Sequence, residues 1–230
     1  MLGALGAFLF NVSLMPYFLA STYFENFQFV KDLKEGKITV NKTEQVYIQE
    51  NTSLQNAIEK VKHSVVSVQG TANASGLIVT SDGLVATLAS ITKPNGNVNV
   101  FLNGEAMDFT VTKTDTKNNL ALLKLSKNNL QTVGFVDSNK VKLGQRVFVI
   151  GQIAATENTG ETNQNNWFTN EGIITEITNG IIKTNIVERP VVAGGPLFNS
   201  AGELVGLNVV DKNGKVSAIS VDKIQALLGL

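Results

Sequence analysis

The stretch from Ile182 to Asn199 reads IKTNIVERPVVAGGPLFN, and the prediction of the fold starts from it. Residues 180–186 and 196–199 are short runs of the kind that form β-strands. Pro190 and the run Gly194-Gly195-Pro196 separate them, and Gly and Pro are strong turn formers. A turn between two strands occurs in many folds, so other motifs must specify this one.

Five further stretches, taken in order with Ile182–Asn199, resemble the HtrA/Deg family of trypsin-like serine proteases. No single stretch is specific for the family. Their occurrence together in the family's order, over about residues 64–228, is specific. They are SGLIVTSDGLVAT (75–87), DTKNNLALLKL (115–125), LGQRVFVIG (143–151), ELVGLN (203–208) and VSAISVDKI (216–224).

The resemblance implies an all-β fold of two six-stranded antiparallel β-barrels, about residues 64–126 and 140–221, within a domain of residues 51–230. A lead-in helix is expected over 52–62, because Thr52 and Gln55 form a capping-box pattern and apolar residues follow at helical spacing. A closing helix is expected over 222–228, with no PDZ-like sequence after it. The expected strands are 64–69, 75–80, 84–89, 97–102, 107–113 and 120–125, then 147–151, 168–175, 180–186, 196–199, 204–210 and 216–221.

The resemblance also places the catalytic triad, and this chain has none of its three residues. Ser90 stands at the position of the general base, Asn119 at that of the aspartate and Ala193 at that of the nucleophile. A methyl group cannot attack a carbonyl, a hydroxyl is not a base near neutral pH, and an amide has no charge to stabilise an imidazolium. The oxyanion turn has also changed, because Val191 and Val192 replace a Gly and an Asn. We therefore expect a naturally degenerate site.

Two other catalytic arrangements would use His63 or Lys93, and we expect neither. His63, the only histidine of the chain, precedes the first expected strand and reads as a helix-end or surface residue. A dyad of Ser90 with Lys93 would need a serine on the strained turn that carries Ala193.

The segment Met1–Phe24 is uncharged, apolar and long enough to cross a bilayer core of ~30 Å as a helix. A cleaved signal peptide is the alternative, since small residues occur around Ala20. Residues 25–50 are expected to form a juxtamembrane helix and a linker with extended segments at 38–40 and 45–49. Lys31, Lys34 and Lys37 follow the apolar segment, which alone would place the barrels in the cytoplasm, whereas the resemblance implies an extracytoplasmic location, periplasmic or at the cell surface.

Composition excludes several classes of function. Lys and Arg together number 19, as do Asp and Glu, with no basic stripe, so a nucleic-acid partner is not indicated. The chain has no cysteine and one histidine, and it shows no phosphate-binding glycine motif, so we expect no metal and no cofactor.

The sequence thus predicts a membrane-anchored pseudoprotease that acts as a binding or structural subunit. Its partners would be the membrane through residues 1–24, other membrane proteins or a peptide segment, and an oligomer is possible. An active endopeptidase of protein quality control and a chaperone-like peptide binder are the alternatives. A bound peptide is expected to add as a strand to Val216, Ser217, Ala218, Ile219 and Ser220, unless the polar loop 152–166 covers that edge.

Overall fold

The computed structural model describes residues 43–70, 72–92, 98–154 and 166–230, with side chains from residue 52 onward. The predicted membrane anchor and most of the juxtamembrane segment, together with Lys93 and most of the loop 152–166, lie outside the described residues. The chain divides into two units, Met1–Gln49 and Glu50–Leu230. Everything that follows on packing concerns the second unit. None of the described helices has the length and apolar character needed to cross a membrane.

The lead-in helix is longer than predicted. α4 runs over Thr43–Val61, so the expected extended segment at 45–49 is wrong, and Thr52 lies inside the helix rather than at its cap. Ala57 and Val61, on one helical face, are 4% and 0% exposed and belong to the main core. Burial of this apolar stripe stabilises the helix more than local capping does. After α4, the short 3-10 helix η2 (Lys62–Ser64) leads into the first strand.

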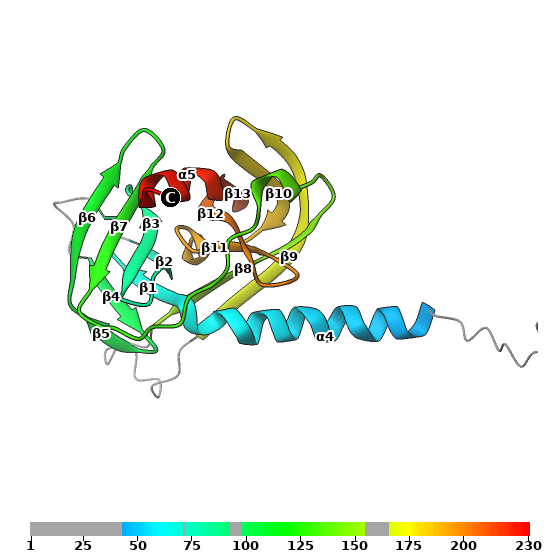
Figure 1. Cartoon of the computed structure of the whole chain (residues 1–230), viewed down its shortest axis with the longest axis horizontal. Helices are drawn as coiled ribbons and strands as arrows, with labels where there is room; N and C mark the ends of the chain where they lie inside the picture. Colours follow the sequence, from blue (N-terminus) through cyan, green and yellow to red (C-terminus); the bar gives the residue numbers. More distant parts are fainter. Residues whose placement is uncertain (1–42, 71, 93–97, 155–165) are drawn as a thin grey trace, which may run out of the picture. The chain divides into compact units, whose positions relative to one another are not determined.

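The first sheet has seven antiparallel strands in the order β5-β4-β1-β2-β3-β7-β6 (Figure 1). The predicted closed six-stranded barrel is therefore wrong here. The single strand expected over 107–113 divides at Asp108 into β5, which pairs with β4, and β6, which pairs with β7. β5 and β6 are thus the two edges of the sheet. The strands are β1 Val65–Gln69, β2 Asn73–Ile78, β3 Leu84–Leu88, β4 Asn99–Leu102, β5 Glu105–Met107, β6 Phe109–Asp115 and β7 Leu120–Leu125.

The second set of six strands forms the closed barrel that the sequence predicts, in the order β10-β13-β12-β11-β8-β9. Burial alternates along β10, where Ile182, Thr184 and Ile186 face inward and their neighbours are exposed. This is the pattern of a strand with one solvated face. The strands are β8 Arg146–Ile153, β9 Asn166–Thr178, β10 Ile181–Val187, β11 Pro196–Asn199, β12 Leu204–Val210 and β13 Lys215–Ser220.

The predicted closing helix is present as α5, Val221–Leu228, and Val221, Ile224 and Leu227 bury its apolar face. The largest core cluster joins α4, the closed barrel and the inner side of the first sheet. In it the rings of Phe148 and Phe198 lie 5.5 Å apart. The turns that carry the candidate site are held on this core.

Candidate functional site

The positions of the base and the aspartate lie side by side. Ser90 is exposed in the turn after β3, and Asn119 immediately precedes β7. Asn119 has a φ of 55°, in the left-handed region that asparagine tolerates, and its Oδ1 accepts the backbone N–H of Ser90 at 2.8 Å. The Asn119 carbonyl also accepts the N–H of Ala89 at 3.1 Å. The pair fixes two turns on each other and provides no group that could remove a proton from a nucleophile.

Ala193 follows the 3-10 turn η5 (Pro190–Val192) and precedes Gly194, which has a φ of +74°. A Cβ added at Gly194 would lie 2.6 Å from the carbonyl oxygen of Ser75 and 2.9 Å from Cδ1 of Ile91. The turn therefore packs directly on the first sheet, beside the turn that carries Ser90. The turn that carries Ala193 thus packs beside Ile91, the neighbour of Ser90, and Ser90 is hydrogen-bonded to Asn119; none of the three positions has a triad side chain.

The backbone donor of Ala193 is already used. Its N–H donates to the carbonyl of Pro190 at 2.8 Å, within η5. An oxyanion hole needs free N–H groups aimed at the position where negative charge develops. Here the donor at the nucleophile position points back into its own turn. The changed residues in this turn, Val191 and Val192, are 3% and 0% exposed, so burial of their side chains holds the turn in this form.

A buried hydroxyl that the sequence analysis did not single out fixes this turn. Ser75 Oγ donates to the carbonyl of Val191 at 2.7 Å and accepts the N–H of Gln152 at 3.3 Å. Thr87 Oγ1 donates to the Ser75 carbonyl at 2.9 Å. Ser75 stands at the start of the SGLIV motif, but nothing in that motif reveals a partner more than a hundred positions away. The nucleophile turn is thus held from the first sheet by side chains on β2 and β3.

Replacement of Ser75 by alanine should destabilise the fold by about 1–3 kcal/mol, because it leaves the buried carbonyl of Val191 and the N–H of Gln152 without this partner. Urea unfolding of the two chains measures the difference. Ser126→Ala, at an exposed serine, is the matched control and should change stability by less than about 0.5 kcal/mol. Equal effects of the two substitutions would show that the Ser75 hydroxyl does not support the turn.

His63 is exposed in η2, directly before β1. Within the described residues, no hydrogen bond connects it with Ser90 or with the η5 turn. The same residues contain no group of three or more His, Cys, Asp or Glu side chains that could hold a metal ion. In the part of the chain that the structure describes, no imidazole therefore reaches the triad positions.

The predicted peptide-binding edge, Val216–Ser220, is not an edge in the structure. β13 pairs with β12 on one side, along Gly206–Val210, and with β10 on the other, along Ile181–Lys183. Thr184 Oγ1 also donates to the carbonyl of Val216 at 2.8 Å. A peptide cannot add as a strand to backbone groups that are already paired, so this prediction is wrong at these residues.

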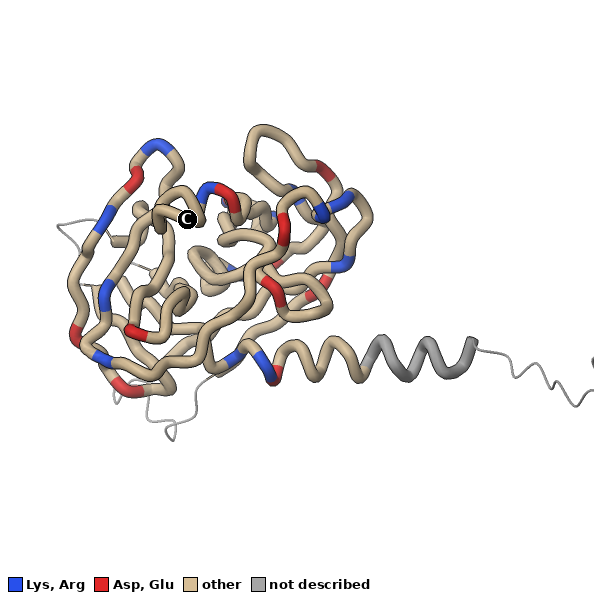
Figure 2. Tube along the Cα trace, in the orientation of Figure 1, with Lys and Arg blue, Asp and Glu red and all other residues tan. Residues whose placement is uncertain are grey.

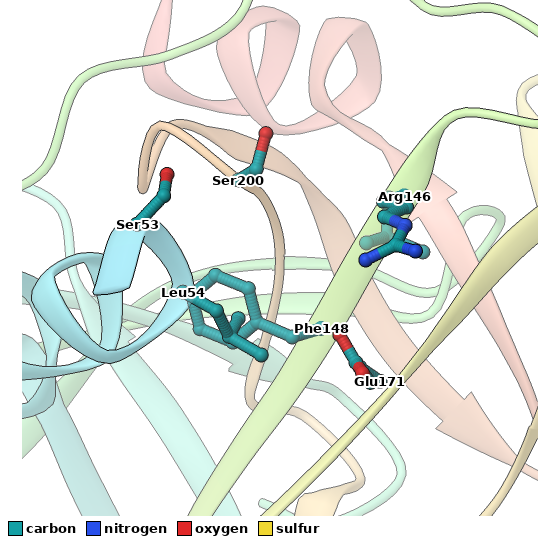
Figure 3. A pocket seen from close by; sticks show the side chains of 7 residues that line it. Ser53, Leu54, Arg146, Phe148, Glu171 and Ser200 are labelled. Atoms are coloured by element: carbon teal, nitrogen blue, oxygen red, sulfur yellow. The ribbon is translucent and has the colours of Figure 1, made fainter. Parts of the chain in front are cut away.

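Two of the hollows among the described residues differ in their relation to the triad positions. The larger, about 680 Å³, opens beside Ser90 and Asn119 and reaches Val111 on β6. The smaller, about 120 Å³, lies where α4 packs on the closed barrel, with Leu54 and Phe148 at its apolar floor (Figure 3). It contains no triad position, so we assign it to helix packing. Its remaining lining residues are Ser53, Arg146, Val147, Glu171 and Ser200.

Comparisons with known proteins agree with this geometry. The family model of the trypsin-like peptidase domain matches residues 74–207. A probable periplasmic serine endoprotease, DegP-like, of Halomonas elongata is 32% identical over 143 residues, which cover 58% of this chain and 28% of the relative. Serine protease HTRA1A of Danio rerio is 28% identical over 74% of this chain and 40% of the relative. The putative serine protease HhoB of Synechocystis is 30% identical over 68% of this chain and 39% of the relative. The chain thus spans less than half the length of each of these relatives.

Proposed function

The chain belongs to the HtrA-type trypsin-like peptidase family, and we propose that it is a member without proteolytic activity that works as a binding subunit. The observation that carries the proposal is the state of the η5 turn. Ala193 has no nucleophilic atom, and its N–H is bonded to Pro190 at 2.8 Å. Both the attacking group and an oxyanion donor are missing at one residue.

The other triad positions support the same conclusion. Proteolysis in this fold needs a nucleophile, a base within hydrogen-bond reach and a group that orients the base. Ser90 and Asn119 meet only through a backbone N–H and a side-chain amide. Loss of one triad residue leaves a residual acceleration of about 10³–10⁴ over water, which depends on an intact oxyanion hole. A single engineered change at the nucleophile would not explain substitutions at all these positions.

The purified full-length chain, in detergent, should not hydrolyse casein or a peptide ester above the rate of the buffer. The reason is the absence of any group that can attack the carbonyl. A mock purification from cells that do not produce the chain shows the contribution of contaminating proteases. Hydrolysis that exceeds this sample and follows the chain through purification would contradict the proposal.

The names of the relatives favour the opposite possibility, an active serine endopeptidase of protein quality control. Those names describe proteins that the chain covers only in part. The residues at the triad positions argue against an enzyme, since they lack the groups that the reaction requires.

We also propose that residues 1–24 anchor the protein in a membrane with the barrel outside the cytoplasm. The length and apolar character of Met1–Phe24 support the anchor, and the relative named as periplasmic supports the location. Carbonate extraction should leave the full-length chain in the membrane pellet, while a chain that begins at residue 43 should be released. Release of the full-length chain, or a barrel spared by protease added to spheroplasts, would contradict the anchor or its orientation.

A further inference from the structure

β6 is an edge strand of the described sheet. Within the described residues it pairs with β7 alone, and its residues 110–114 are all exposed. In Figure 1 it is the outermost strand of the first sheet, and the β6–β7 hairpin projects toward the level of α5. The backbone N–H and C=O groups on the outer side of an edge strand are available to another chain. An extended peptide that adds as the next strand uses these groups without any catalytic residue.

A groove adjoins β6 on the side of the turns that carry Ser90 and Asn119. The hollow of about 680 Å³ lies against β6 and the two turns of the degenerate site. Its wall includes Val111, a large apolar side chain that is 48% exposed, and the side chains of Ala89 and three threonines. A second hollow of about 340 Å³ shares Thr114 and Thr116 with the first and continues to α5. Together they provide an apolar section followed by a polar one.

The polar section is positively charged. Lys113, Lys117 and Lys223 line it, whereas Asp115 is the one carboxylate among its lining residues. Figure 2 shows basic positions on the β6–β7 hairpin and on α5. The Asp115 carboxylate accepts the backbone N–H of Asn118 at 3.1 Å and its side-chain amide at 2.5 Å, so it is already engaged. These hydrogen bonds from Asn118 lower the pKa of Asp115.

The lysines of this section differ in how far other groups of the protein engage them. Lys113 Nζ donates to the carbonyl of Leu227 at 2.6 Å, at the end of α5. Lys223 forms no ion pair within the described residues. The chain as a whole has a net charge of zero, so this excess of positive charge is local to the groove. An anionic partner would gain electrostatic attraction here that a neutral or basic one would not.

Protection against aggregation is the simpler reading of this edge. β6 has a bulge between Val111 and Lys113, and bulges and lysines on an edge strand discourage pairing with other chains. That reading accounts for the bulge and Lys113. It does not account for Lys117 and Lys223, which lie off the strand, or for a groove with an exposed apolar wall.

We propose that β6 and the adjoining groove bind an extended acidic segment of a partner protein. The segment adds as a strand to β6, places an apolar side chain against Val111 and directs its carboxylates to Lys117 and Lys223. Peptide binding at β6 goes beyond the proposed lack of proteolysis. A chain without proteolytic activity need not bind a peptide, and a peptide can bind at β6 whether or not the chain is active.

Fluorescence anisotropy of the full-length chain in detergent tests the charge preference. The probe is a fluorescein-labelled ten-residue peptide in which Glu alternates with Val and Thr, compared with the same peptide carrying Lys for Glu. We expect the acidic peptide to bind and the basic one not to. In K117E/K223E the affinity for the acidic peptide should fall about tenfold, as expected from reversal of one exposed and one half-buried charge.

K140E/K142E is the matched control, because it changes the net charge equally at lysines outside the groove. The control should bind the acidic peptide like the native chain. Equal binding of both peptides, or equal losses in the two double variants, would overturn the proposal. Displacement of the peptide by millimolar inorganic phosphate would also overturn it, because the groove would then be a simple anion site.

Strand addition has a test of its own that leaves the protein unchanged. In a strand that adds to an edge, alternate N–H groups face the protein and the others face away. Two acidic peptides, N-methylated on the odd or on the even residues, should therefore differ, with one losing binding and the other retaining it. Retention by both would show that the peptide does not pair with β6. Neither result depends on hydrolysis, so failure here is distinguishable from failure of the proposed function.

Discussion

A chain carrying S90H, N119D and A193S together will remain a poor protease. These substitutions supply the side chains of a triad but leave the η5 turn unchanged, with the N–H of residue 193 bonded to Pro190 and Val191 and Val192 buried. Loss of one oxyanion donor costs about 10²–10³ in kcat in enzymes of this kind. Adding V191G and V192N should free the turn and raise kcat/KM by at least about 10²-fold over the triple variant. Hydrolysis of a peptide ester measures both.

The chain with V191G and V192N alone is the control, and it should stay inactive because no nucleophile is present. Thermal unfolding of each variant shows whether the comparison is between folded proteins. A triple variant as active as the fivefold variant would show that the η5 turn does not block catalysis. The triad side chains would then be the only missing parts.

Gly194→Ala should destabilise the protein by about 2–5 kcal/mol. A left-handed conformation costs a residue with a Cβ about 1–2 kcal/mol. The added methyl group would also lie 2.6 Å from the Ser75 carbonyl oxygen, a backbone atom that cannot move aside freely. Overpacking of this kind costs about 1–3 kcal/mol more. Urea unfolding monitored by circular dichroism measures the loss.

Gly144→Ala separates the two contributions. Gly144 has a φ of +76°, close to the +74° of Gly194, but nothing lies within 4 Å of an added Cβ there. It should therefore show the backbone cost alone, about 1–2 kcal/mol. Equal losses at the two glycines would mean that the nucleophile turn is not packed tightly on the first sheet.

The sequence was sufficient for the closed barrel because each of its strands is a short run with its own motif or burial pattern. It was insufficient at Asp108, where the chain bends and one expected strand becomes β5 and β6, since nothing in the residues marks the bend. α4 extends to Thr43 although residues 45–49 alternate like a strand. Strand pairing overrides the local sequence pattern at Asp108, and continuation of the helix overrides it at residues 45–49. A single sequence displays neither effect.

The candidate site, like the fold, could be predicted from the sequence only in part. Motif order identified Ser90, Asn119 and Ala193 as the triad positions, through the family resemblance. The hydrogen bond from Ala193 to Pro190 and the contact of Ser75 with Val191 depend on three-dimensional distance and could not be predicted. The peptide edge at Val216–Ser220 follows from the family resemblance alone, and the structure pairs both sides of that strand, β13.

Labelling with a fluorophosphonate probe tests the central claim most directly. The probe reacts covalently with an activated serine nucleophile, and its adduct is located by mass spectrometry of the purified full-length chain. The absence of a nucleophile at Ala193 and of a base at Ser90 predicts no adduct on any peptide of the chain, with a known serine protease labelled in the same tube as the positive control. A stoichiometric adduct on any serine or threonine of this chain, Ser90 above all, would contradict the account.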